Sequence, residues 1–232
     1  MRKQVMHIGA LLLALALLLG ACGSPAALVD DEKEILRIVA AGKRFIGELQ
    51  NGVQPSNARF PEDYEDVVAA FARFFDLDTL FVSGVSLESN RSNRYTCVIS
   101  GRQGADVTLS FTKDEPMQWS CAMAHCASYC DEVLERYLGF LREKDAQALA
   151  NWMIYDGTPV EQEVELAGKT IAYYNRWYDL SETSVRDPIL TWDDCFNFIV
   201  DDAQGRPCLF ELYYREYLCY PRYPTYEQLE GY

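Results

Sequence analysis

The sequence lacks both an excess of basic residues and a long apolar run. Lys and Arg number 21 against 35 Asp and Glu, which gives a formal charge of −14 in 232 residues. A nucleic-acid partner requires clustered positive charge to neutralise phosphates, so the composition argues against one. The apolar stretch from Ile8 to Leu19 would form a helix of about 18 Å, well short of a membrane core of ~30 Å.

Motifs for the common catalytic chemistries are also missing. The sequence contains no P-loop, G-x-S-x-G, H-E-x-x-H or dinucleotide-binding motif. Two acidic pairs resemble acid–base groups, but Asp201 and Asp202 precede Gly205, and turn chemistry explains them. Asp193 and Asp194 precede an expected strand, where they either cap a turn or line a cleft. The sequence therefore predicts no cofactor and no specific reaction.

The first 22 residues combine the features of an export signal. Arg2 and Lys3 precede the apolar run, and Leu19-Gly20-Ala21-Cys22 follows it. This segment resembles the lipobox of bacterial lipoproteins. The resemblance implies that residues 1–21 are removed as a signal peptide and that the Cys22 thiol carries a diacylglycerol. It places the chain on the extracytoplasmic face of the cell membrane, most plausibly in a Gram-positive cell. The alternative is an ordinary secretory signal.

Removal of the signal would take away two basic residues and no acid, leaving a formal charge of −16. Anionic lipids repel such a body, so we expect the lipid on Cys22 to provide the membrane attachment. Residues 22–29 are expected to form a short linker, and the seven residues after Cys22 span at most about 25 Å. The folded part should therefore lie close to the membrane.

Three blocks of sequence recur about 100 residues apart. Residues 71–77 resemble 174–180, and residues 95–111 align without a gap onto 196–212. Residues 34–37 resemble 132–135, at an offset of 98. Because internal repeats indicate repeated structural units, we expect unit 1 at residues 30–120 and unit 2 at 121–219. Residues 220–232 form a tail rich in Tyr and Pro.

Each unit has helical periodicity first and strand periodicity afterwards. We expect helices at 31–50 and 61–75 in unit 1, and at 128–144, 145–153 and 160–178 in unit 2. Alternating apolar residues predict strands at 80–87, 95–100 and 107–112, and again at 196–200 and 208–212. Helices followed by an antiparallel sheet, twice, define an α+β fold class.

This order of elements resembles the NTF2-like (cystatin-like) superfamily, in which a curved sheet wraps a long helix to form a cone. The likeness is closer for unit 2 than for unit 1, which has no short middle helix. It implies two tandem cones. An unrelated two-layer α+β fold is the alternative.

Seven cysteines remain besides Cys22. Cys97 and Cys208 share the apolar faces of expected strands, so we interpret them as small core residues. Cys121, Cys126 and Cys130 surround His125, which is the one histidine beyond the signal. Their spacing is looser than that of a usual zinc site. A metal site, a disulfide within the group and ordinary thiols all remain open.

Aromatic residues are concentrated in unit 2 and the tail. Tyr173 and Trp177 lie on its long helix, and Trp192 follows before the strands. Flat amphipathic rings suit sugar stacking or protein docking, so these three are candidate ligand-binding residues. The alternative is a Tyr-rich core with a packed tail. The segment from Tyr220 to Pro224 is expected to lie extended on the surface, outside the sheet.

The sequence favours a binding or accessory module whose partner is an envelope protein, a peptide or a glycan. One alternative is an enzyme with its pocket in the cone of unit 2. Another is a thiol redox or metal protein that uses the cysteines around His125.

Overall fold

The computed structural model describes residues 25–87, 94–102, 105–153, 161–191, 194–215 and 218–230. Cys22 and Trp192 lie outside these ranges. Unit 1 contains α2 (Pro25–Gln50), α3 (Val67–Phe74) and an antiparallel sheet. Its strands are β1 (Phe81–Leu87), β2 (Arg94–Ser100), β3 (Asp106–Thr112) and β4 (Trp119–Ser120), paired in that order.

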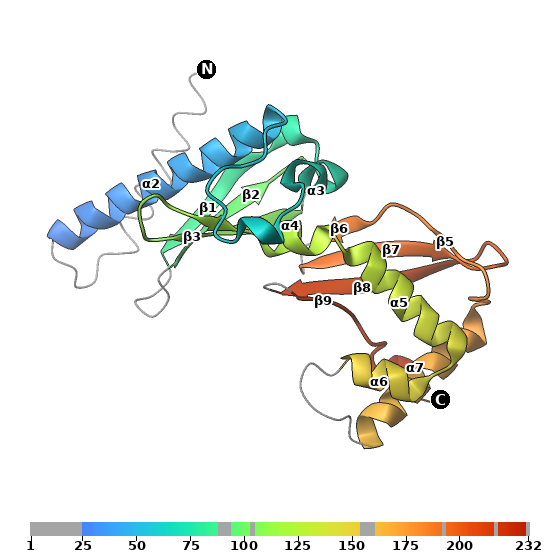
Figure 1. The fold of residues 1–232 in the computed structure, drawn as a ribbon. Coiled ribbons are helices and arrows are strands. Elements are labelled where there is room, and N and C mark those ends of the chain that lie inside the picture. Colours follow the sequence, from blue (N-terminus) through green and yellow to red (C-terminus); the bar gives the residue numbers. More distant parts are fainter. Residues whose placement is uncertain are drawn as a thin grey trace.

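Unit 2 repeats this plan with a larger helical layer. Its helices are α4 (Ala122–Ala127), α5 (Cys130–Glu143), α6 (Ala146–Met153) and α7 (Glu161–Trp177). Its strands are β5 (Ser184–Val185), β6 (Ile189–Thr191), β7 (Cys195–Asp201), β8 (Pro207–Arg215) and β9 (Leu218–Pro221), followed by α8 (Tyr226–Leu229). Figure 1 shows the two sheets in tandem, with α2 along the first and α5 across the second. The predicted α+β class with two helix-then-sheet units is confirmed.

The strands of the two sheets pair in the same register. Tyr95 pairs with Phe111 in unit 1, and Phe196 pairs with Leu212 at the positions 101 residues later. The edge strands follow the same rule, because β5 and β6 pair with β7 as β1 pairs with β2. One difference is that β1 is continuous with a bulge, whereas Pro188 separates β5 from β6. Proline lacks the N–H that a strand ladder needs, so it interrupts this edge.

The predicted inward faces of the central strands are confirmed. The six positions in each sheet are all buried: Tyr95, Cys97, Ile99, Val107, Leu109 and Phe111 in unit 1, and Phe196, Phe198, Val200, Cys208, Phe210 and Leu212 in unit 2. These faces pack against the helices in one continuous core. Gly205 has φ +73°, as expected for the turn between β7 and β8. Gly104, which is 101 residues earlier, lies outside the described residues.

The buried faces of α2 and α5 do not correspond at the separation of 98 residues that the sequence suggested. At 98 residues, Leu36 would correspond to Leu134, but Leu36 is 62% exposed and Leu134 is 1% exposed. The buried faces coincide when Ile38 is placed on Cys130, 92 positions later. The short Glu-x-Leu similarity misled the alignment because burial, and not residue identity, defines the equivalent helix faces.

Several expected boundaries were wrong. Helix α2 begins at Pro25, so residues 25–29 are helical and not linker; proline is well suited to a first helical turn. The expected helix 61–75 is split into a 3-10 turn at Pro61–Asp63 and α3, with Tyr64 extended between them. The Tyr64 side chain is buried and its hydroxyl accepts the Cys121 N–H, so tertiary contacts hold this break. The sequence also missed α4 as a helix separate from α5.

The prediction that the tail lies outside the sheet is wrong. Tyr220 and Pro221 belong to β9, and the Arg222 N–H continues the ladder to the Glu211 carbonyl at 2.8 Å. Proline is tolerated here because β9 is an edge strand. The chain then enters α8, and Leu229 is buried. Among the described helices, none is long and apolar enough to cross a membrane.

Candidate binding site

Helix α7 presents its tyrosines in two directions. Tyr174 is buried and stacks on Phe210 of β8, with ring centroids 4.8 Å apart. Tyr173 is one position earlier, so it points about 100° away around the helix; it is half-buried and contacts the edge of Tyr174. Tyr178 follows the helix and is also half-buried. The helix thus fills the core with one ring and leaves two others beside a groove.

The C-terminal segment forms the opposite wall. Glu211 of β8 accepts from the Arg222 guanidinium at 3.1 Å, in addition to the backbone bond between the same residues. Thr225 then caps α8: its hydroxyl accepts from the Gln228 N–H, while its own N–H donates to the Gln228 side chain. These bonds fix Tyr223 and Thr225 across from α7.

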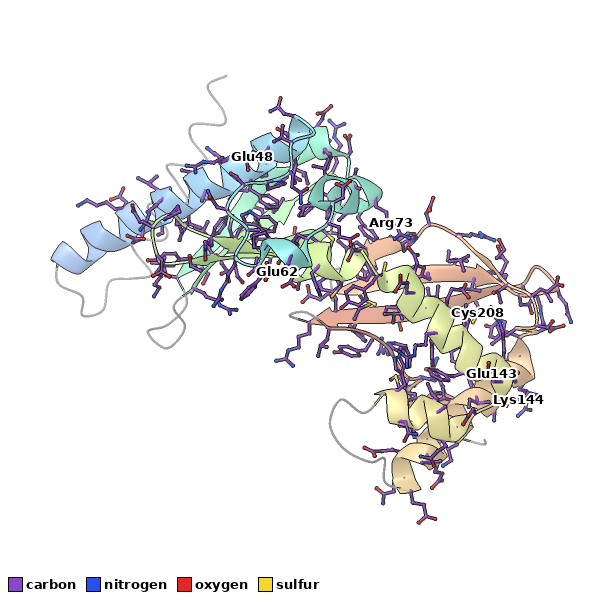
Figure 2. All side chains as sticks on the ribbon, viewed as in Figure 1. Glu48, Glu62, Arg73, Glu143, Lys144 and Cys208 are labelled. Carbon is purple, nitrogen blue, oxygen red and sulfur yellow. The ribbon has the colours of Figure 1, made fainter. Side chains whose placement is uncertain are left out.

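The walls enclose a groove of about 510 Å³. We call it the tyrosine groove and define it by Tyr173, Tyr178, Glu211, Arg222 and Tyr223. Tyr174, Cys208, Leu209, Pro224, Thr225 and Gln228 complete its lining. Figure 2 labels Cys208, a residue of β8 that belongs to this lining. The volume suits a ligand of moderate size.

Two phenols and one thiol of the groove are held in their neutral forms. Burial raises the pKa of Tyr223 to about 12 and that of the Cys208 thiol to about 12, and it also raises the pKa of Tyr178. These phenols and this thiol are therefore protonated at neutral pH. The groove offers flat ring surfaces, hydrogen-bond donors and one ion pair, and these groups bind ligands without supplying a nucleophile.

The three aromatic residues singled out from the sequence do not come together. Tyr173 lines the tyrosine groove. Trp177 lies outside it and is 51% exposed, and the Arg176 guanidinium lies over its ring at 5.3 Å from the ring centroid. Trp192 lies outside the described residues. Sequence analysis noted Tyr223 only as part of a Tyr-rich tail, and it missed Glu211 and Arg222. The β8–β9 register that joins these two residues was not visible in the sequence, because the tail was expected to leave the sheet.

The cysteines around His125 are buried between the units. Cys121, Cys126 and Cys130 are at most 1% exposed, and burial raises their pKa values to about 12, 11 and 12. The His125 Nδ1 lies 2.9 Å from the Asp63 carbonyl oxygen. Thiols with such raised pKa values stay protonated and react slowly.

All seven cysteines in the described ranges have free thiols. Those ranges contain no group of three or more His, Cys, Asp and Glu side chains placed to hold a metal ion. Cys97 and Cys208 are buried on the sheet faces, which confirms their interpretation as core residues.

The acidic pair at the β7–β8 turn has a structural role, as its position predicted. Asp201 binds the Arg186 guanidinium at 2.7 and 2.8 Å. The buried Asp202 carboxylate accepts the N–H groups of Asp179, Gln204 and Arg206, as well as the Arg206 guanidinium. Burial opposes ionisation of Asp202, but these hydrogen bonds outweigh it and hold its pKa well below the ordinary range.

The fold and the groove define an α+β protein of two tandem helix-and-sheet units with a tyrosine-lined groove on the second. Comparison of the chain with known protein families, curated proteins and solved structures finds no match.

Proposed function

We propose that this protein is a lipid-anchored binding module on the extracytoplasmic face of the cell membrane and that it binds a glycan in the tyrosine groove. The observation that carries the proposal is the convergence of three half-buried tyrosines and the Glu211–Arg222 pair around one groove of about 510 Å³. Ring faces stack on the apolar faces of sugars, and the polar groups bind sugar hydroxyls.

The N-terminal sequence supports the location. The charge, apolar run and small residues before Cys22 match the lipobox pattern, and the helix begins at Pro25, only two residues after Gly23. Two or three acyl chains hold a protein stably on a membrane, whereas a strongly acidic body has no attraction to anionic lipids. This arrangement would hold unit 1 and the groove-bearing unit 2 near the cell wall.

The alternatives of an enzyme or a thiol redox protein have less support. Acid–base catalysis at neutral pH requires a group whose pKa lies near 7, and redox chemistry requires an accessible thiolate. The phenols of the groove and the cysteines around His125 are instead shifted upward by burial. No geometry in the described residues favours either activity over binding.

Calorimetric titration with a soluble N-acetylglucosamine oligosaccharide tests the groove. The protein would be the lipid-free chain from residue 23, which retains every described residue. We expect Tyr173→Ala to weaken binding about fivefold to tenfold, since a stacked ring contributes about 1 to 1.4 kcal/mol. Trp177→Ala is the matched control because Trp177 lies outside the groove, and its affinity should be unchanged. Equal losses in both variants, or binding only to an envelope peptide, would contradict the glycan proposal.

Membrane fractionation tests the anchor separately. The full chain should partition with the membrane, and mass analysis should find a diacylglycerol on Cys22. Cys22→Ser removes the thiol that the lipid requires and should leave the protein unlipidated. An unmodified Cys22 in membrane-associated protein would refute the anchor without affecting the groove.

A further inference from the structure

A second cavity, separate from the tyrosine groove, lies where the two units meet. It has a volume of about 230 Å³. Unit 1 lines it with Arg94 of β2 and Ser120 of β4, and unit 2 lines it with Asp194, Tyr214 and Arg215. We call it the junction cleft and define it by these five residues. Figure 1 shows α4 between the two sheets, and Ala122 and Met123 of α4 also line the cleft.

The units are joined firmly enough to give this cleft a defined shape. The Arg73 guanidinium of α3 binds the Asp131 carboxylate of α5 through two bonds of 2.7 and 2.8 Å. Phe74 of unit 1 stacks on Phe196 of unit 2 with ring centroids 5.0 Å apart. Figure 2 places Arg73 at the boundary between the units. Interfaces between domains are common places for ligand sites.

Within the described ranges, both arginines of the cleft lack a side-chain partner. Arg94 and Arg215 make no ion pair or hydrogen bond with a side chain of any described residue. Arginines elsewhere are engaged, as Arg73, Arg186 and Arg206 each bind a carboxylate within 2.8 Å. In a chain with 35 acids and 21 bases, two guanidinium groups meet at a cavity whose described lining contains one carboxylate, that of Asp194, so positive charge is in excess there. Their planar forks suit carboxylate or phosphate oxygens.

The cleft also contains a buried hydroxyl that is poorly satisfied. Tyr214 is only 5% exposed, and its hydroxyl lies near the Asp194 carboxylate without a hydrogen bond of standard geometry to any described residue. Burial and the nearby Asp194 carboxylate raise the pKa of Tyr214, so the group remains a donor. An unsatisfied buried hydroxyl costs about 1 to 3 kcal/mol. A ligand oxygen in the cleft would remove that cost.

We propose that the junction cleft binds a small anion through a carboxylate or phosphate group, which accepts from Arg94, Arg215 and the Tyr214 hydroxyl. The volume of about 230 Å³ restricts the ligand to a few heavy atoms beyond this group. Because the two arginines come from different units, the bound anion would bridge unit 1 and unit 2. This site is independent of the glycan proposal, since it shares no residue with the tyrosine groove.

Substitution of Asp194 provides a test in which anion binding should become tighter. Its carboxylate lines the same cleft and repels an anion. Its backbone has φ +52°, a conformation that asparagine also tolerates well. Asp194→Asn therefore removes the negative charge without imposing backbone strain, and it should tighten anion binding.

Titration calorimetry on the lipid-free chain from residue 23, with inorganic phosphate and succinate as probes at constant ionic strength, tests the site. We expect saturable binding of one probe per chain. The preferred probe identifies whether the natural ligand presents a phosphate or a carboxylate. Arg94→Gln and Arg215→Gln should each weaken binding at least about tenfold, as expected for loss of a charge-assisted hydrogen bond. Tyr214→Phe should weaken it by a smaller factor.

Arg102→Gln is the matched control, because Arg102 is exposed and lines none of the cavities described above. Its affinity should equal that of the parent chain, and urea midpoints should confirm that each variant is folded. Three results would overturn the proposal: no saturable binding of either probe, equal losses in Arg102→Gln and Arg94→Gln, or weaker binding in folded Asp194→Asn.

Discussion

Unit 1 and unit 2 pair their strands in one register but cover those strands with different helical layers. The central hairpins correspond pair by pair at 101 residues. Helix α3 has eight residues, whereas α7 has 17, and unit 2 also contains α6. The hairpin register is strongly constrained because a slip of one residue would expose the whole buried face. The helices are less constrained, so their number and length differ between the units.

The buried faces of the two sheets differ most in side-chain size at one equivalent position. Cys97 in unit 1 corresponds to Phe198 in unit 2, and both are fully buried. Helix α2 carries Gly42 opposite Cys97, where a Cβ would lie 2.6 Å from the cysteine sulfur. Unit 1 therefore brings its helix close to small residues, whereas unit 2 fills the equivalent space with an aromatic ring.

The largest expected effect tests this pair of positions. Phe198→Ala should destabilise the protein by about 3 to 5 kcal/mol because it leaves a large cavity. Cys97→Ala, at the equivalent place in unit 1, should cost only about 1 kcal/mol, near the value of one buried methylene. Urea unfolding followed by circular dichroism measures both. Similar costs at the two positions would contradict the contrast.

The next largest effect tests how closely α2 approaches the sheet of unit 1. Gly42→Ala should destabilise by about 1 to 3 kcal/mol, because the added methyl group overlaps the Cys97 sulfur. Gly139→Ala on α5 is the control, since nothing lies within 4 Å of its Cβ. That change should stabilise by about 0.5 to 1 kcal/mol through helix propensity. A stabilised Gly42→Ala would show that the two helices do not differ in their distance from the sheet.

A smaller effect compares the two hairpin turns through pH. The pKa of Asp202 is lowered in the folded protein, so its contribution to stability is present above the ordinary aspartate pKa of about 4. That contribution is lost as the pH falls below this value. The corresponding turn of unit 1, which begins at Gly101, has no acid. Asp202→Asn should therefore flatten the dependence of unfolding free energy on pH between 5 and 3. An unchanged slope would rule out this role.

The smallest effect concerns the contact between the units. Arg73→Gln should cost about 0.5 to 1 kcal/mol, since the Arg73–Asp131 pair is partly exposed to solvent. High salt should reduce the difference. Urea midpoints at low and high salt measure both quantities. If the loss is unaffected by salt, the pair contributes through packing and not through charge.

The hairpins were predictable from the sequence, whereas much of the candidate site was not. Alternation from Tyr95 to Phe111 and from Phe196 to Leu212 identified the strands and their buried faces. Tyr173 was found because aromatic residues cluster on its helix. Trp177 was selected by the same reasoning, yet it is exposed and lies outside the groove. Helical periodicity alone does not say which side of a surface helix a second element will cover.

Local sequence determined the strands, their duplication and the α+β class, because two-residue periodicity and turn residues act over short distances. Tertiary structure decided the break at Tyr64, the return of the tail through Arg222 and the meeting of Arg94 with Tyr214 in one cleft. Each of these depends on contacts between residues far apart in the chain. Burial and hydrogen bonding across such distances override local preference, and a single sequence does not record which distant partner will supply them.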